Sequence, residues 1–382
     1  MKIETLLANL ALNSDFKDPY GASHFPIYNT ATFDLKKQEG NDRIYDYSRS
    51  DNPTRNALEN IFAKAENGFG CVCTNTGIAA ISVLFETVLK NGDTVLVEND
   101  SYGGTYRLLK VLSEKNNIKT IYTDFTNLNL VEEELKNNEI SLILCESPTN
   151  PSLKIIDLEE IGKLSKKYNT LFAVDNSMAT FVSQKPLDLG ADFSVFSTTK
   201  FISGHGSVTA GAVVSKTKEL HQKVRFFANA YGNAQSPMDV YLTSLGLPTL
   251  VYRMKAQEES ALKIAKFLKN FHQIKSVKFP ALEDFEQYDL AKKQMSIIPA
   301  VLTIQLQDEE TANQLINNTK LFGKKVSFGT SDSRLEIPAK MSHATNSKDS
   351  LASKGIDNAT VRISVGLENT EDLIEDLSQA LQ

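Results

Sequence analysis

The sequence predicts an α/β protein in which helices cover both faces of a large, mostly parallel sheet, followed by a smaller C-terminal α+β domain. Short apolar runs alternate with helical patterns between residues 70 and 215. A long helical pattern then covers 250–270 behind Pro248, and the apolar runs 300–306 and 361–365 come after it. A chain of 382 residues, of which 41% are hydrophobic, has enough apolar side chains for two domains.

The first segment, residues 1–60, is expected to be an arm with one short helix. Pro26, Gly40, Asn52 and Pro53 interrupt its polar and aromatic residues. Such a segment has little core of its own, so it should lie on something else, such as a neighbouring subunit. A main domain of residues 61–247 and a C-terminal domain of residues 248–382 are expected to follow.

The elements of both domains follow from the hydrophobic pattern. Apolar runs that are too short for helices predict buried strands. The expected strands of the main domain are residues 70–74, 94–97, 119–122, 142–145, 171–174, 193–196 and 210–214. The clearest helical patterns are 78–89, 106–114 and 158–168, and the C-terminal domain adds helices near 311–317 and 371–381.

Composition and charge exclude several classes of protein. The formal charge of −6 comes from interleaved Lys and Glu without a basic stripe, so no nucleic-acid partner is expected. The three cysteines, Cys71, Cys73 and Cys145, lie in apolar runs and predict buried thiols in a reducing compartment. We find no signal peptide and no apolar run near the ~20 residues of a spanning helix. The expected location is the cytoplasm, without membrane contact.

Residues just after each strand are the candidates for function, because ligands of parallel sheets bind beyond the carboxyl ends of the strands. The Thr76-Gly77-Ile78 turn opens a helix and is either an anion site or a plain capped start. Tyr102 follows the second run and either stacks on a flat ring or belongs to a turn. Neither a P-loop nor a dinucleotide fingerprint is present.

Two further strand ends carry polar groups. The segment 146–151 holds Asn150 between two prolines, a rigid shelf for hydrogen bonds to a hydroxyl or a carboxylate. Asp175 ends a buried strand, where a carboxylate is costly unless it is paired. Its partner would be a protonated pyridine nitrogen, a structural arginine or a helix N-terminus.

Lys200 follows the run 193–196 and the hydroxyl residues Ser197 and Thr199, which suit a phosphate. A desolvated ammonium loses its proton more easily, and the amine can then form a Schiff base with an aldehyde cofactor. A surface lysine after a strand is the plain alternative. Because Asp175, Lys200 and the Thr76-Gly77 turn converge on one sheet edge, we interpret Lys200 as a lysine that binds pyridoxal phosphate.

At this point the sequence resembles the Cys/Met-metabolism family of pyridoxal-phosphate enzymes, the trans-sulfuration family. The resemblance covers nearly the whole chain and implies the fold of type I pyridoxal-phosphate enzymes, like that of aspartate aminotransferase. The matching segments are 47–55, 102–105, 146–151, 174–176, 197–205, 341–344 and 361–366.

The resemblance implies a role for each matching residue. Lys200 matches the Schiff-base lysine, Asp175 the partner of the pyridine nitrogen, and Tyr102 the stacking tyrosine. The phosphate would be held by backbone and hydroxyl groups of Gly77, Ile78, Ser197 and Thr199, and by Tyr47 and Arg49 of an adjacent subunit. That arrangement implies a dimer of catalytic dimers and needs no metal. The substrate group consists of Arg362, which would bind the α-carboxylate, with Asn150, Ser327, Arg107 and Asp46.

Within the family the chain looks most like cystathionine γ-synthase. The segments 71–77, 102–107 and 228–230 carry that likeness, with Arg107 placed to hold a distal carboxylate. Methionine γ-lyases typically have a cysteine where Gly104 stands, which argues against methionine as the main substrate. We therefore predict replacement of the acyl group of an O-acylhomoserine by the thiol of cysteine, in which Lys200 moves the proton of Cα.

Other reactions stay open at this stage. A cystathionine or methionine γ-lyase and an O-acylhomoserine sulfhydrylase are the near alternatives, and an aminotransferase or a cofactor-binding protein without turnover are the distant ones. Two departures from the family pattern affect the substrate. Asp332 or Glu336 stands in for the usual specificity glutamate, and Gly206-Ser207 replaces Ser-Asp.

Overall fold

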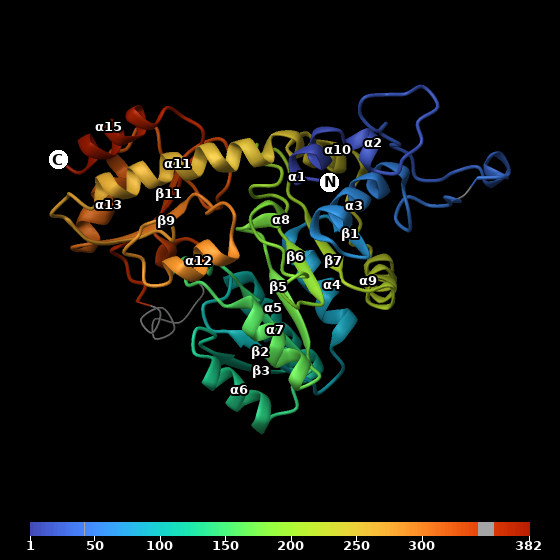
Figure 1. The fold of residues 1–382 in the computed structure, drawn as a ribbon, viewed down its shortest axis with the longest axis horizontal. Coiled ribbons are helices and arrows are strands. Elements are labelled where there is room, and N and C mark those ends of the chain that lie inside the picture. Colours follow the sequence, from blue (N-terminus) through green and yellow to red (C-terminus); the bar gives the residue numbers. More distant parts are fainter. Residues whose placement is uncertain (42, 343–354) are drawn as a thin grey trace.

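The computed structural model describes residues 1–41, 43–342 and 355–382, and contains two sheets (Figure 1). The larger sheet has seven strands in the order β1-β7-β6-β5-β4-β2-β3. These are β1 (Gly70–Thr74), β2 (Thr94–Glu98), β3 (Lys119–Thr123), β4 (Leu142–Glu146), β5 (Leu171–Asp175), β6 (Phe193–Phe196) and β7 (Gly211–Ser215). Each of the seven predicted strands is confirmed within one residue at either end.

Strand direction in this sheet brings the predicted site residues to one edge. Strands β3, β2, β4, β5 and β6 are parallel, whereas β7 runs antiparallel to both β6 and β1. In the register Glu146 pairs with Asp175, and Asp175 with Val195. The carboxyl ends of three neighbouring strands therefore lie side by side, which confirms a mostly parallel α/β sheet.

Both faces of the large sheet are buried. Cys71 and Cys73 on β1 belong to one apolar cluster, and Val72 between them belongs to another, because successive side chains of a strand point to opposite faces. All three cysteines are buried free thiols, as predicted. The flanking helices are α4 (Gly77–Val88), α5 (Gly103–Asn116), α6 (Leu128–Asn137), α7 (Leu158–Lys167), α8 (Thr180–Ser183), α9 (Lys218–Tyr231) and α10 (Pro237–Leu245).

Part of the predicted arm is a core helix instead. The short pieces α1 (Ile3–Ala8), α2 (Leu10–Asn13) and the 3₁₀ turn η1 (Leu35–Gln38) precede α3 (Pro53–Glu66), a buried helix of 14 residues. Proline is compatible with the first turn of a helix, and Asn52 caps this one by accepting a hydrogen bond from the Thr54 N–H. The interpretation of Pro53 as a breaker was therefore wrong.

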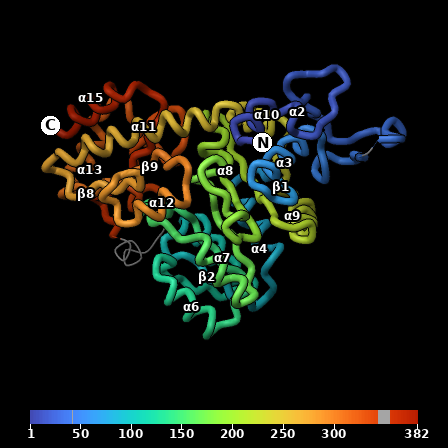
Figure 2. The backbone as a smooth tube through the Cα atoms, viewed as in Figure 1, coloured from blue at the N-terminus to red at the C-terminus, as the bar shows by residue number. Residues whose placement is uncertain are grey.

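The segment around η1 extends away from both sheets, as the blue segment at the right of Figure 1 shows. Helix α1 lies beside the 3₁₀ turn η2 (Leu247–Thr249), about 240 residues further along the chain. Figure 2 shows the two chain termini well apart. No helix in the described ranges is long and apolar enough to cross a membrane.

A second, five-stranded sheet lies beyond the long helix α11 (Leu250–Leu268). Its order is β10-β11-β12-β9-β8, with β8 (Ile274–Lys278), β9 (Val301–Leu306), β10 (Gly323–Lys324), β11 (Arg334–Glu336) and β12 (Thr360–Ser364). Helices α12 (Tyr288–Gln294), α13 (Glu309–Asn318), α15 (Thr370–Ala380) and the 3₁₀ turn η3 (Pro338–Lys340) complete it. The smaller α+β unit is thus present, and the predicted boundaries after residues 60 and 247 stay predictions.

One buried carboxyl predicts how stability depends on pH. Glu66 at the end of α3 is fully buried, neither carboxyl oxygen has a hydrogen-bond partner among the described residues, and burial raises the pKa of this carboxyl well above its usual range. The folded chain therefore binds a proton that the unfolded chain releases near pH 4.5, so stability should fall as pH rises above that value. Glu66→Gln should be more stable by about 1–3 kcal/mol at pH 8 and should lose part of this pH dependence.

The measurement is the thermal unfolding midpoint between pH 5 and pH 8. Glu133→Gln on α6 is the matched control, because it makes the same chemical change at an exposed position. Equal pH dependence in Glu66→Gln and the wild type would show that Glu66 is not the buried acid responsible.

Candidate active site

A chain of hydrogen bonds joins the ends of β5 and β6. The Ser177 hydroxyl and N–H both donate to Oδ1 of Asp175, over 2.5 and 3.0 Å, and the N–H of Ser197 donates to the Ser177 hydroxyl over 2.6 Å. Within the described residues, Oδ2 of Asp175 has no protein partner. Burial raises the pKa of this carboxyl, and a cation placed against Oδ2 would favour its ionised form. The sequence did not single out Ser177.

Lys200 lies in the loop after β6 and contacts the small sheet domain. Its Nζ donates to the Ser327 hydroxyl over 2.6 Å and lies 4.9 Å from the centre of the Phe328 ring. Burial, helped by the positive charge of Arg362, lowers the pKa of Lys200 to about 8. The share of neutral amine near neutral pH is thus larger than for an ordinary lysine, which favours action as a nucleophile or base.

Arg362 on β12 is buried beside Lys200 and is held on several sides. Its guanidinium donates to Oδ1 of Asn150 over 3.0 Å and to the Ser327 carbonyl over 2.5 Å, and it pairs with Glu336 at 2.9 Å. Its Nε has no partner among the described residues. A fixed fork of donors with an unsatisfied N–H suits a carboxylate.

Ser327 ties the two cationic side chains together. Its hydroxyl accepts from Lys200 and its carbonyl accepts from Arg362. The residue has φ +78°, a left-handed conformation that costs energy for a residue with a side chain. The predicted substrate group of Arg362, Asn150 and Ser327 is therefore assembled around Lys200.

The turn predicted to bind an anion lies at the start of α4, close to β6. A Cβ on Gly77 would lie 2.6 Å from the Cβ of Ser197, and one on Gly211 would lie 2.8 Å from the Cα of Gly77. A residue with a Cβ would clash at either position, so only glycine fits at Gly77 and Gly211. The Thr76 hydroxyl accepts from the Ala79 N–H, whereas the first N–H groups of a helix have no partner within it. Gly77 and Ile78 thus present the donors expected for a phosphate.

The hydroxyl of Thr199 is engaged elsewhere in the loop. It donates to the Ala210 carbonyl over 3.2 Å and accepts from the Ala210 N–H over 2.9 Å. This pair holds the Lys200 loop against the start of β7. The role of Thr199 in phosphate binding stays a prediction.

Tyr102 stands at the start of α5, half exposed, and its ring lies over Gly104. A Cβ on Gly104 would overlap that ring, so a larger residue there would displace it. Arg107 is exposed on the second turn of the same helix. The roles assigned to Tyr102 and Arg107 stay predictions.

The structure places the two acids of the first departure from the family pattern. Asp332 pairs with Arg334 at 2.9 Å and with Lys325 at 3.0 Å, and Arg334 donates to the Val326 carbonyl next to Ser327. Glu336, by contrast, is buried against Arg362. Of the two acids, Glu336 therefore contacts the predicted carboxylate-binding group. The residues His343 and Ala344 of the matching segment 341–344 lie outside the described residues.

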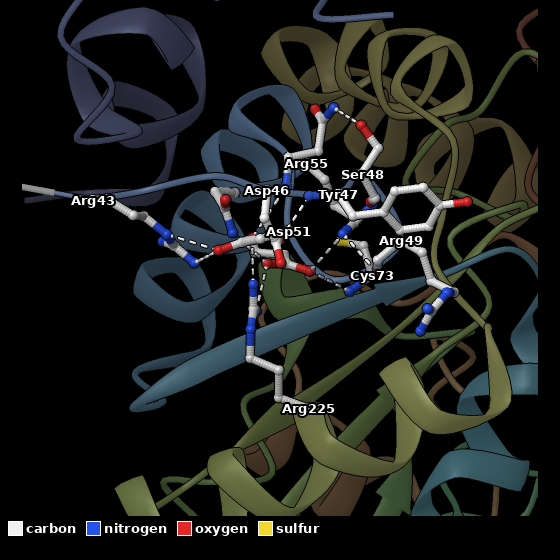
Figure 3. Close-up of polar contacts among 12 residues, drawn as sticks. Arg43, Asp46, Tyr47, Ser48, Arg49, Asp51, Arg55, Cys73 and Arg225 are labelled. Carbon is white, nitrogen blue, oxygen red and sulfur yellow. Dashed lines mark hydrogen bonds and ion pairs between the residues drawn. The ribbon is translucent and has the colours of Figure 1, made fainter. Parts of the chain in front are cut away.

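The arm residues Asp46, Tyr47 and Arg49 are exposed and lie in a polar cluster with Asp51, Arg55 and Arg225 (Figure 3). Arg49 donates to the carbonyl and to Oδ1 of Asn229 on α9, over 2.9 and 2.6 Å. Its guanidinium also lies 5.4 Å from the centre of the Tyr47 ring. Oδ1 of Asp46 accepts from the Tyr47 N–H. Both Tyr47 and Arg49 extend away from Arg43 in Figure 3.

The residues of the sheet edge fit pyridoxal phosphate in three independent ways. The unpaired oxygen of Asp175 suits a protonated ring nitrogen, Lys200 supplies an amine of lowered pKa, and the Gly77 turn supplies phosphate donors. The family model for Cys/Met metabolism PLP-dependent enzymes matches residues 4–382. The chain belongs to this family. Pyridoxal phosphate is accordingly its cofactor, and the resemblance and fold predicted from the sequence are confirmed.

Members of this family with different reactions are about equally similar to the chain. The cystathionine beta-lyase of Lactococcus lactis subsp. cremoris (strain MG1363) is 37% identical over 95% of this chain and 94% of its own. The L-methionine gamma-lyase of Fusobacterium nucleatum subsp. polymorphum is 39% identical over 96% and 95%. A solved structure of cystathionine gamma synthase from Xanthomonas oryzae pv. oryzae is 37% identical, with a TM-score of 0.95 over 100% and 98%. The chain is thus a pyridoxal-phosphate enzyme of the trans-sulfuration family.

Proposed function

We propose that the protein catalyses γ-replacement on an O-acylhomoserine with cysteine, which yields cystathionine. The observation that carries the amino-acid part is the group formed by Lys200, Ser327, Arg362 and Asn150. The choice of replacement rests on the likeness to the Xanthomonas oryzae synthase structure, and Gly104 beneath Tyr102 argues against methionine as the substrate.

Each side chain has a defined task in this proposal. Arg362 and Asn150 bind the α-carboxylate and orient the Cα–H bond toward Nζ of Lys200, which takes the proton as a base. Asp175 holds the positive charge of the ring nitrogen, and Tyr102 covers the ring. The cofactor, when bound, supplies an electron sink for the carbanion. In the net reaction the C–O bond at Cγ breaks, the acyl group leaves as a carboxylate, and the cysteine sulfur forms the new bond to Cγ.

Two copies of the chain would share these sites. Tyr47 and Arg49 are exposed on the arm, and the family resemblance assigns them to the cofactor phosphate of a second copy. We therefore propose a catalytic dimer, assembled further into a tetramer. The buried free cysteines fit the reducing conditions of the cytoplasm.

A thioether lyase is the second candidate, favoured by the reactions of the Lactococcus and Fusobacterium relatives. Purified protein with O-succinyl- or O-acetylhomoserine and cysteine should form cystathionine, measured by mass spectrometry. If it instead converts cystathionine alone into 2-oxobutyrate, cysteine and ammonia, it is a γ-lyase. Release of pyruvate and homocysteine would show a β-lyase. Methionine should be a poor substrate in each case.

A further inference from the structure

The backbone of the arm is tightly folded where Tyr47 and Arg49 leave it. The N–H groups of Ser50 and Asp51 both donate to the Tyr47 carbonyl, over 2.9 and 3.0 Å. This closes a turn over residues 47–51, with the exposed Tyr47 and Arg49 side chains on it. The turn precedes α3 and lies over β1 and α9, which Figure 3 shows beneath it.

Arg55 holds this turn from the buried side. It lies in the first turn of α3, and the residue is only 3% exposed. Its guanidinium donates to the carbonyls of Ser48 and Arg49, over 2.8 and 3.2 Å, and to that of Gln235. Burying a guanidinium costs free energy unless its N–H groups are hydrogen-bonded. Here these groups bond backbone carbonyls on both sides of the Arg49 side chain, and they fix the backbone at that position.

Arg225 on α9 holds the other end of the turn. It bonds the Asp51 carboxylate at 2.5 Å and the buried Glu59 carboxylate at 3.1 Å, and Arg43 bonds Asp51 as well. Glu59 also accepts from the N–H of Cys73 on β1, over 3.0 Å. Burial would raise the pKa of Glu59, but Arg225 and Arg55 lower it overall, so the carboxylate stays ionised. The turn is thereby fixed to α3, α9 and β1 at once.

The charges of this cluster favour an anion at the exposed side of the turn. Arg43, Arg55 and Arg225 outnumber the carboxylates of Asp51 and Glu59 by one, and the exposed Arg49 and Asp46 add one charge of each sign, so the cluster keeps one net positive charge. A phosphate group carries close to two negative charges and accepts several hydrogen bonds.

We propose that Arg225 and Arg55 are positioning residues, which fix the 47–51 turn so that Tyr47 and Arg49 bind the cofactor phosphate of a second copy of the chain. This inference rests on the proposed role of Tyr47 and Arg49. Neither positioning residue contacts the phosphate itself. They keep the phosphate donors of Tyr47 and Arg49 in place before the cofactor binds. Binding then does not cost the conformational entropy of ordering the arm.

The test compares two ligands of the cofactor-free protein. Arg225→Gln should weaken the binding of pyridoxal phosphate by about 10- to 100-fold, because the phosphate donors are displaced. The same variant should bind pyridoxal, which lacks the phosphate, as the wild type does. Dissociation constants are measured from the quenching of tyrosine fluorescence, and a thermal unfolding midpoint shows that the variant is folded. Asp51→Asn removes the same contact from the other side and should show the same pattern.

Lys223→Gln is the matched control, because it removes one positive charge from an exposed ion pair on the same helix. It should leave both dissociation constants unchanged. If Arg225 acts through Arg49 and Tyr47, the loss of affinity in the double variant Arg49→Gln/Arg225→Gln should be smaller than the product of the two single losses.

Three results would overturn the inference. These are unchanged affinity for pyridoxal phosphate in Arg225→Gln and Asp51→Asn, an equal loss for pyridoxal, and losses that multiply in the double variant. The proposed reaction fails in a different way. If the wild type forms no cystathionine but the variants still lose affinity for pyridoxal phosphate and not for pyridoxal, the positioning role stands. Only the assigned substrate is then refuted.

Discussion

Lys200→Ala should lower the turnover of any amino-acid substrate by about 10²–10⁴-fold, the range for loss of a general base. The lysine lies half-buried between Ser327 and the Phe328 ring, and its pKa is lowered to about 8. The neutral amine is therefore available both to bind the cofactor aldehyde and to take the proton of Cα. Treatment of the wild type with borohydride should leave the cofactor covalently attached to the peptide that contains Lys200, as detected by mass spectrometry. The variant should show no such attachment.

Lys216→Ala is the control for this experiment. Lys216 also follows a strand directly, but that strand, β7, is antiparallel to β6. It therefore lies at the opposite edge of the sheet, where its Nζ donates to the Leu187 carbonyl. Turnover and cofactor attachment should be close to those of the wild type. Attachment that persists in Lys200→Ala, or moves to another lysine with turnover retained, would refute the assignment of Lys200.

The site residues at the strand ends could be predicted from the sequence because they closely follow short apolar runs. Asp175 and Lys200 follow apolar runs by no more than four residues, and parallel strands necessarily bring such positions to one edge. Helix α3 was missed for a local reason too. Pro53 interrupts a helix at most positions but starts one at its first turn, and the cap by Asn52 decides between the two.

Contacts between residues far apart in the sequence could not be predicted from the hydrophobic pattern. Ser327 bonds Lys200 across 127 residues, and Arg362 bonds Asn150 across 212. Only the family resemblance placed Ser327 and Asn150 with Arg362. Ser177 carries no signal of its own, since a serine two residues after a strand occurs in many turns. Its role depends on the pairing of β5 with β6, which brings the Ser197 N–H to its hydroxyl.

The choice between Asp332 and Glu336 likewise depended on the second sheet. On β11 the residue opposite Arg362 of β12 is Glu336, which places the carboxylate directly beside the guanidinium. Asp332 precedes the strand and pairs with Arg334 and Lys325 instead. Strand register is set by the packing of both faces of the sheet. The sequence motif alone therefore could not decide which of the two acids contacts Arg362.

Arg362→Lys should raise the KM for an amino-acid substrate by about 10- to 100-fold, with a smaller effect on cofactor binding. Lysine retains the charge that Glu336 needs in its buried position, so the fold should persist. It lacks the planar fork that now reaches Asn150 and the Ser327 carbonyl, and a bidentate carboxylate contact is lost with it. A hydrogen bond to a charged group contributes about 1.5–3 kcal/mol, which corresponds to this range of KM.

The matching control for Arg362→Lys changes the substrate instead of the protein. An amine that keeps the reacting side chain but lacks the α-carboxylate should react slowly with the wild type and at nearly the same rate with the variant. The preference for the carboxylate, measured as a ratio of kcat/KM values, should therefore shrink in Arg362→Lys. If the ratio is unchanged while KM rises, the guanidinium supports the Lys200 loop through Ser327 and another group binds the carboxylate. Because Ser327 accepts from both side chains, only this ratio separates binding from support.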